Sequence, residues 1–202
     1  SKKYWSEYVE HDFLNKIVTG DLHIKKFQKY LLQDYIFLQQ FLRILSLSCY
    51  KSKSNLDIER SINFITSIKH ELKLHISFCK KWGISEKKLI KIKPLKANRA
   101  YTDYVLKVGK KGSILDIYTS LAPCIIGYGE IGFRLSKIKN WERSKYKSWI
   151  KTYSSRDYQL VARNNIKYLD YLFKNEKNNN LKKLSKLFNN ATILEKRFWD
   201  MI

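Results

Sequence analysis

The scarcity of chain-breaking residues is the feature that most limits what this sequence can fold into. Only two prolines and seven glycines occur among 202 residues, whereas sheets and long loops need more such residues. Leucine and lysine, both abundant here, favour helices. The run over 27–50, FQKYLLQDYIFLQQFLRILSLSCY, is apolar nearly all round and contains neither proline nor glycine. A helix of this kind belongs at the centre of a protein, so the sequence predicts an all-α fold.

Apolar periodicity and end signals predict a series of helices. The expected helical ranges are about 3–18, 25–50, 56–82, 97–109, 113–136, 143–153, 154–174 and 180–201. Ser54 or Asn55 should cap the third helix and Gly83 should end it. Pro123 should kink the helix that contains it, because proline lacks a backbone donor. No repeat or second domain is visible, so we expect a single-domain, multi-helix bundle over 1–202.

The net charge of +22 comes mostly from lysines and does not by itself indicate a nucleic-acid-binding protein. Only eight of the 40 basic residues are arginine, whereas proteins that read nucleic acids favour the arginine fork. The lysines are spread over the whole chain, which is typical of solvated helix faces. We therefore expect no specific nucleic-acid partner, although the charge attracts anions without specificity.

Apolar runs, the N-terminal stretch and the cysteines indicate where in the cell the protein is expected. No apolar run approaches the roughly 20 residues of a membrane span, and the N-terminal stretch carries acids, unlike a signal peptide. Three cysteines lie far apart, as Cys49, Cys79 and Cys124, which fits free thiols in a reducing compartment and gives no zinc spacing. We expect a cytoplasmic protein without membrane, metal or cofactor.

Three reactive side chains stand in apolar surroundings. Asp34 lies in LLQDYIFL, Cys124 in LAPCIIGYGEIG and Glu195 in ATILEKRFWDMI. Each has an ordinary explanation, because a buried acid often pairs with lysine and most buried cysteines are inert. Together with nearby tyrosines they favour a shared pocket. Cys124 and Tyr128 are four residues apart, so we expect them on one helix face.

Five sequence blocks, spread over nearly the whole chain, occur in a recognisable order. They are HDFLNKIVTGDLHIKKFQKYLLQDYIFL, AYTDYVL, LAPCIIGYGEIG, WIKTYSS and LEKRFWDM. The chain thereby resembles the TenA family, also called thiaminase II or aminopyrimidine aminohydrolase. The resemblance implies a helical bundle of the haem-oxygenase-like type, usually a homotetramer. Trp141, Trp149 and Phe173 would need covering in such an assembly if they are exposed.

The resemblance also implies an activity in thiamin metabolism. The substrate class is thiamin or its aminomethyl-pyrimidine breakdown product, and Cys124 matches the nucleophile that adds to the pyrimidine ring. Glu195 matches the catalytic acid, so it must carry a proton while Cys124 is a thiolate. Asp34 matches the acid that holds the amino group and ring nitrogen, and we expect it to stay ionised. The implied aromatic lining of the pocket is Phe37, Tyr101, Tyr128 and Tyr153.

Other interpretations remain open. Glu71 and His75 are four apart, with His70 adjacent, which is one element of a dimetal or cofactor-binding oxidase on the same fold; alternatively His75 is packed and hydrogen-bonded between helices. A non-enzymatic regulatory or nucleic-acid-binding protein is a second alternative, but no helix-turn-helix with an arginine-bearing recognition helix is visible. A homologue without catalysis is a third, which the presence of Cys124 and Glu195 opposes.

Overall fold

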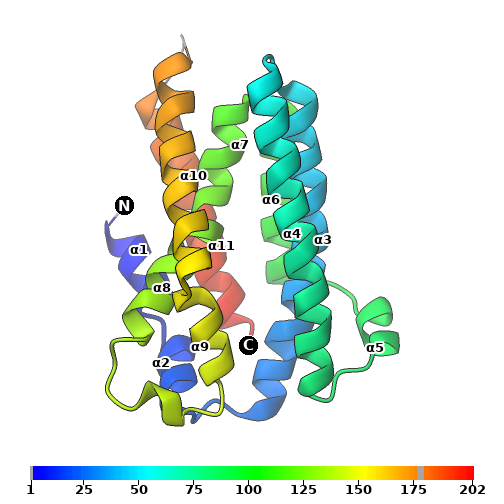
Figure 1. The fold of residues 1–202 in the computed structure, drawn as a ribbon, viewed down its shortest axis with the longest axis vertical. Helices are drawn as coiled ribbons and strands as arrows, with labels where there is room; N and C mark the ends of the chain where they lie inside the picture. The colour runs from blue at the N-terminus through cyan, green and yellow to red at the C-terminus, as the bar shows by residue number, and fades with distance from the viewer. Residues whose placement is uncertain (1, 177–179) are drawn as a thin grey trace. The chain divides into compact units, whose positions relative to one another are not determined.

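The expectation of an all-α fold is confirmed. The computed structural model describes residues 2–176 and 180–202, apart from the side chain of Leu74, and every regular element in this part is a helix. Figure 1 shows the helices. By their internal contacts the residues form two compact units, each described by itself below. The first comprises the residues up to His23 and Tyr118–Asp200, and the second comprises Ile24–Ile117 with Met201–Ile202.

The second unit is built on a pair of long helices. Helix α3 (Ile24–Lys51) packs along α4 (Asn55–Lys81), and α6 (Lys96–Lys111) packs on α3 (Figure 1). Buried side chains occur along α3 from Phe27 to Ser48, as its apolar run predicts. A short helix, α5 (Glu86–Lys91), lies between α4 and α6 in the chain.

The predicted ends of α4 are confirmed. The Ser54 hydroxyl accepts a hydrogen bond from the Asp57 amide and so caps the first turn. At the other end Gly83 has φ +74°, a conformation that glycine adopts without a steric penalty. The cap and stop signals in the sequence therefore fix both ends of this helix.

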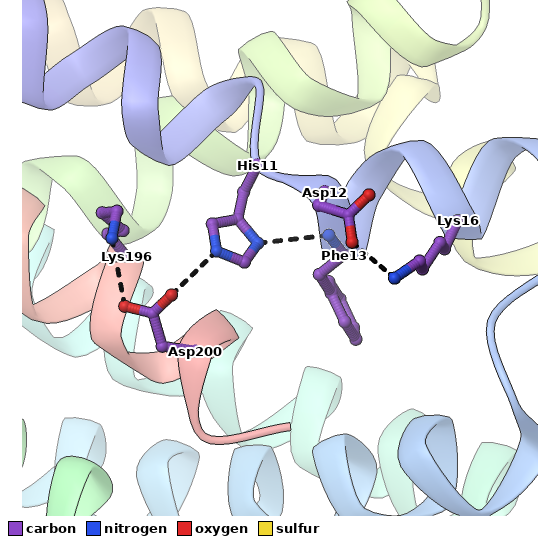
Figure 2. Close-up of polar contacts among 6 residues, drawn as sticks. All are labelled: His11, Asp12, Phe13, Lys16, Lys196 and Asp200. Atoms are coloured by element: carbon purple, nitrogen blue, oxygen red, sulfur yellow. Dashed lines mark hydrogen bonds and ion pairs between the residues drawn. The ribbon is translucent and has the colours of Figure 1, made fainter.

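The first unit begins with two helices where one was predicted over 3–18. Helix α1 (Lys2–Val9) ends before His11, and α2 (Asp12–Thr19) begins after it. The reason is local: the His11 imidazole accepts a hydrogen bond from the Phe13 amide and caps α2, as Figure 2 shows. Histidine is an uncommon N-cap, so the sequence pattern gave no sign of the break.

At Pro123, where a kink was predicted, the helix changes to a π-helical turn. Helix α7 (Ile114–Ala122) leads into the turn η1 (Pro123–Gly127), and α8 (Tyr128–Leu135) follows. Proline removes one donor from the helical ladder, and single π turns of this kind accommodate the loss. Cys124 therefore lies in a wider turn and Tyr128 is the first residue of α8, whereas one regular α-helix was expected to carry both.

The remainder of the first unit is helical. A short 3₁₀ turn, η2 (Trp141–Arg143), precedes α9 (Lys147–Ser154), so the helix predicted from 143 begins later. Helices α10 (Arg156–Asn175) and α11 (Leu181–Asp200) agree with the predicted ranges. Helices α8 and α9 pack together, and α10 and α11 both pack against η1. No helix in the described part of the chain is long and apolar enough to span a membrane.

Candidate active site

Cys124 lies on the π turn, and two tyrosines hold this turn from other helices. The Tyr8 hydroxyl of α1 donates to the Pro123 carbonyl at 3.3 Å, and the Tyr158 hydroxyl of α10 donates to the Ile125 carbonyl at 3.4 Å. Backbone carbonyls that leave the α-helical ladder need such partners when they are buried. The residues on both sides of the half-buried Cys124 are thus fixed.

Two glycines of GYGEIG permit close approach around this turn. A Cβ atom at Gly127 would lie 2.4 Å from a ring carbon of Tyr8, and one at Gly132 would lie 2.3 Å from the backbone carbonyl carbon of Tyr153. Any larger residue would therefore push Tyr8 away from η1 or separate α8 from α9. Glycines inside a helical pattern are the signal that could have predicted these contacts.

The structure brings two predicted pocket residues of the first unit together. The rings of Tyr128 and Tyr153 meet edge to face at 4.8 Å between centroids. The ring centroid of Trp149 lies 4.7 Å from that of Tyr153, and the ring centroid of Trp199 lies 5.5 Å from that of Tyr128. Neither tryptophan was predicted to belong to this cluster. Trp149 is only 3% exposed, so the condition under which it would need covering by a partner chain is not met.

Glu195 is buried on α11, the helix that packs against the π turn. One turn further on, Trp199 stacks on Phe13 of α2, with 4.8 Å between centroids. The end of α11 is also tied by Asp200, which accepts from His11 at 3.0 Å and pairs with Lys196 at 3.2 Å (Figure 2). Stacking and hydrogen bonds thus hold the helix that carries Glu195 against α2.

The second unit holds the other predicted site residues: Asp34 and Phe37 on α3 and Tyr101 on α6. The rings of Phe37 and Tyr101 lie 4.8 Å apart at an angle of 31°, so the structure brings these two together as well. All three side chains are buried. The seven predicted residues therefore form two groups, Asp34, Phe37 and Tyr101 in this unit and Cys124, Tyr128, Tyr153 and Glu195 in the first.

A buried amide pair sets the position of α6. The Asn98 amide donates to the backbone carbonyl of Gln33 at 2.8 Å and to its side-chain oxygen at 3.0 Å. The same Gln33 oxygen accepts from the Leu95 amide at 2.9 Å. These bonds attach the start of α6 to α3, which places Tyr101 on Phe37. Sequence patterns alone gave no reason to pair Gln33 with Asn98.

Asp34 has an unusual electrostatic setting. Burial raises the pKa of its carboxyl to about 7, although a hydrogen bond from Tyr30 acts in the opposite direction. Burial opposes the charged form of an acid, so the surroundings do not by themselves keep Asp34 ionised as the sequence analysis expected. Its carboxylate oxygen Oδ2 lies 3.4 Å from Nδ1 of His75.

His75 is packed and hydrogen-bonded between α3 and α4, as one of the two interpretations of KHELKLHISF predicted. Its Nε2 atom lies 2.8 Å from the Leu31 carbonyl, and its Nδ1 atom faces Asp34. Both ring nitrogens are therefore used within the second unit. Across the residues that the structure describes, no group of three or more His, Cys, Asp or Glu side chains is arranged to hold a metal ion.

The first unit also has an open groove of about 530 Å³ between α1 and the start of α11. Its lining includes Tyr4, Lys182, Lys186 and Asn189. None of the predicted site residues lines it, so this groove is separate from the side chains assigned to catalysis.

Comparison with known proteins gives a family match over the whole chain. The model of the TENA/THI-4/PQQC family matches residues 1–202. The aminopyrimidine aminohydrolase of Helicobacter pylori is 32% identical over all of this chain and 94% of that protein. The aminopyrimidine aminohydrolase of Halalkalibacterium halodurans is 33% identical over 98% of this chain and 89% of that protein.

Solved structures agree with this match. A protein of Silicibacter sp. TM1040, described as a TenA family transcription regulator, has a TM-score of 0.91 at 33% identity and covers 98% of this chain and 90% of its own. A Shewanella denitrificans domain of unknown function, described as having a haem oxygenase-like fold, has a TM-score of 0.79 at 13% identity, with 99% and 87% covered. At that identity the likeness shows the fold alone, and it confirms the expected haem-oxygenase-like type.

Proposed function

This chain belongs to the TENA/THI-4/PQQC family, and from that premise we propose that it is an aminopyrimidine aminohydrolase, or thiaminase II, of thiamin salvage. Both relatives described above bear the aminohydrolase name, and each match covers nearly the full length of that relative. A shared fold alone would not support an activity. The additional support is Cys124, a half-buried thiol on a turn that two tyrosine hydroxyls hold in place.

The proposed reaction replaces an amine with a hydroxyl. The Cys124 thiolate adds to the ring carbon beside N1, and Glu195 gives its proton to N1. The electrons then return through the ring and expel the protonated amine as ammonia, or the thiazolium of thiamin as the thiazole, from the exocyclic methylene. Water adds its hydroxyl to the exocyclic alkene and releases a proton, N1 returns its proton to Glu195 as the thiolate leaves, and hydroxymethyl pyrimidine remains. The covalent adduct divides one difficult substitution into easier steps.

The other predicted residues bind the pyrimidine in this proposal. Asp34 accepts from the amino group, and Phe37 and Tyr101 offer ring surface beside it. Tyr128 and Tyr153 offer ring surface and hydroxyl groups, as aromatic residues with a polar end commonly do in binding sites. The tilted contact of Phe37 with Tyr101 and the edge-to-face contact of Tyr128 with Tyr153 support a lining that is fixed before the ligand binds.

We further propose that the protein is a homotetramer of the cytoplasm and that 1–202 acts as one domain. Exposed apolar side chains on the first unit support self-association, because such surface is commonly covered in an assembly. They include Phe133, Leu160 and Ile166. No specific nucleic-acid partner is part of the proposal.

Side-by-side kinetics test the proposed activity. Purified protein should release ammonia and hydroxymethyl pyrimidine from the aminomethyl pyrimidine, and the thiazole from thiamin if that substrate is also accepted. The comparison of kcat/KM for the two substrates identifies the preferred one. Turnover of neither substrate by folded protein would overturn the proposed function.

A further inference from the structure

We propose that His75 and Asp34 act as one proton-sharing pair, in which His75 takes the proton from Asp34 when the carboxylate accepts from the amino group of an aminopyrimidine. His75 is then a positioning residue that acts through Asp34. The inference rests on the proposed function and adds to it a residue that the family resemblance did not assign.

The Leu31 carbonyl fixes the tautomer of His75. A carbonyl oxygen can only accept, so the Nε2 atom at 2.8 Å must carry a hydrogen and donate it. In the neutral ring the other nitrogen, Nδ1, is then a bare acceptor. It faces Oδ2 of Asp34 at 3.4 Å. Two acceptors that face each other repel, so one proton between them satisfies both atoms.

Burial makes it costly for either Asp34 or His75 to be charged alone. Asp34 is 6% exposed and His75 is 9% exposed, and burial opposes the charged form of each. In accordance with this, burial raises the pKa of Asp34 to about 7 and lowers the pKa of His75. A lone carboxylate here would be costly, whereas a carboxylate beside an imidazolium is an ion pair of zero net charge.

Other titratable groups face the pair from both helices. Glu71 and Cys79 lie one turn before and one turn after His75 on α4, and Tyr30 of α3 donates to Asp34. Burial and the nearby Asp34 charge raise the pKa of Glu71 to about 7 and that of Cys79 to about 12. Cys79 therefore stays a thiol near neutral pH, and among the described groups named here Glu71 is the rival to His75 as the group that takes the proton.

Proton transfer within the pair would give the ligand an ionised carboxylate to bind. The amino group of a pyrimidine donates hydrogen bonds, and an ionised carboxylate accepts them far better than a neutral acid does. If the proton of Asp34 moves to Nδ1 of His75, the carboxylate forms without exchange of a proton with solvent. Binding by the intact pair should then depend little on pH while the pair holds one proton.

The test is the affinity for hydroxymethyl aminopyrimidine, measured by calorimetry for the wild type and for His75→Gln. Glutamine can keep the donor to the Leu31 carbonyl, but it cannot accept the proton, so Asp34 must lose it to solvent. At about pH 8 an Asp34 carboxyl with a pKa of about 7 is ionised in both proteins, so they should bind alike there, and the ratio of variant to wild-type Kd should increase several-fold as the pH falls below about 7. His70→Gln, an exposed change on the same helix, should follow the wild type.

The outcomes separate the possibilities. A Kd ratio that stays constant with pH would mean that His75 is merely structural and would overturn the inference, and so would the same pH dependence in Glu71→Gln instead. A wild type that neither binds the hydroxymethyl pyrimidine nor hydrolyses the aminomethyl pyrimidine would overturn the proposed function as well. If His75→Gln does not fold, ¹⁵N spectra of the wild type decide the matter, since only four histidines are present. Addition of the pyrimidine should move Nδ1 of His75 to its protonated shift, and an unchanged shift would refute proton transfer.

Discussion

At the scale of single residues, buried polar atoms are the most informative part of this molecule. Asp34 and Glu195 are each almost fully enclosed, which is unusual for acids without a functional or structural partner. For Asp34 the partners are visible: Tyr30 donates to it and His75 faces it. An acid held in this way is suited to orient a ligand that brings its own donor.

Replacing Asp34 with asparagine tests this role. The amide keeps the shape of the side chain but can accept through only one atom, so the pyrimidine is held less well. Loss of a hydrogen bond to a charged group costs about 1.5–3 kcal/mol, and we expect KM to increase strongly and kcat to fall. Unchanged binding of hydroxymethyl pyrimidine by calorimetry would refute the role, and circular dichroism with thermal melting checks that the variant is folded.

The candidate residues were recognisable in the sequence, but their surroundings were not. Asp34, Cys124 and Glu195 stand out as reactive groups in apolar blocks. Trp149 and the Leu31 carbonyl come into place only when separate helices pack, and no local pattern encodes those contacts. The roles of the seven residues stay predictions from the family resemblance, supported by burial and by the two aromatic contacts.

At the scale of elements, the sequence predicted helices well wherever a breaking or capping residue marks their ends. Ser54 and Gly83 each act as expected, and Pro123 begins the π-helical turn. The break at His11 was missed because it depends on an imidazole that also reaches Asp200 of α11. A contact between helices far apart in the chain thus decides a local feature, and periodicity cannot reveal it.

Gly132→Ala should be destabilising at this scale. The added methyl would meet the backbone of Tyr153 at 2.3 Å, so α8 and α9 must separate, and overpacking of this kind costs about 1–3 kcal/mol or more. Gly109→Ala is the matched control, since its methyl would meet side-chain atoms and no backbone, the nearest being the end of the Leu47 side chain at 3.1 Å. Denaturant melts of both variants measure the difference. Equal stability of the two would contradict the close packing of α8 on α9.

At the scale of the whole molecule, net charge opposes the association of identical chains, whereas exposed apolar surface favours it. A net charge of +22 opposes association of identical chains. Large apolar side chains are nevertheless exposed in both units, including Phe133 and Leu160 in the first and Tyr50 and Ile90 in the second. Trp149, which the sequence analysis had considered for such a surface, is buried instead.

We expect a tetramer in solution. Light scattering should give about four times the 24.2 kDa of one chain, and the assembly should weaken as salt is lowered because screening of like charges is then reduced. Leu160→Lys should shift the distribution towards smaller species if this residue lies in an interface. A particle of one chain's mass at micromolar concentration would contradict the proposed assembly.

The covalent role of Cys124 is the central claim, and Cys124→Ser tests it most directly. Serine has nearly the same shape, but its hydroxyl is a far weaker nucleophile than a thiolate. The measurement is release of hydroxymethyl pyrimidine from the aminomethyl substrate, compared with Cys49→Ser, which changes another half-buried thiol, on α3. We predict that Cys124→Ser folds normally and loses turnover by several orders of magnitude, while Cys49→Ser keeps it. Near-native turnover by Cys124→Ser would contradict the covalent mechanism.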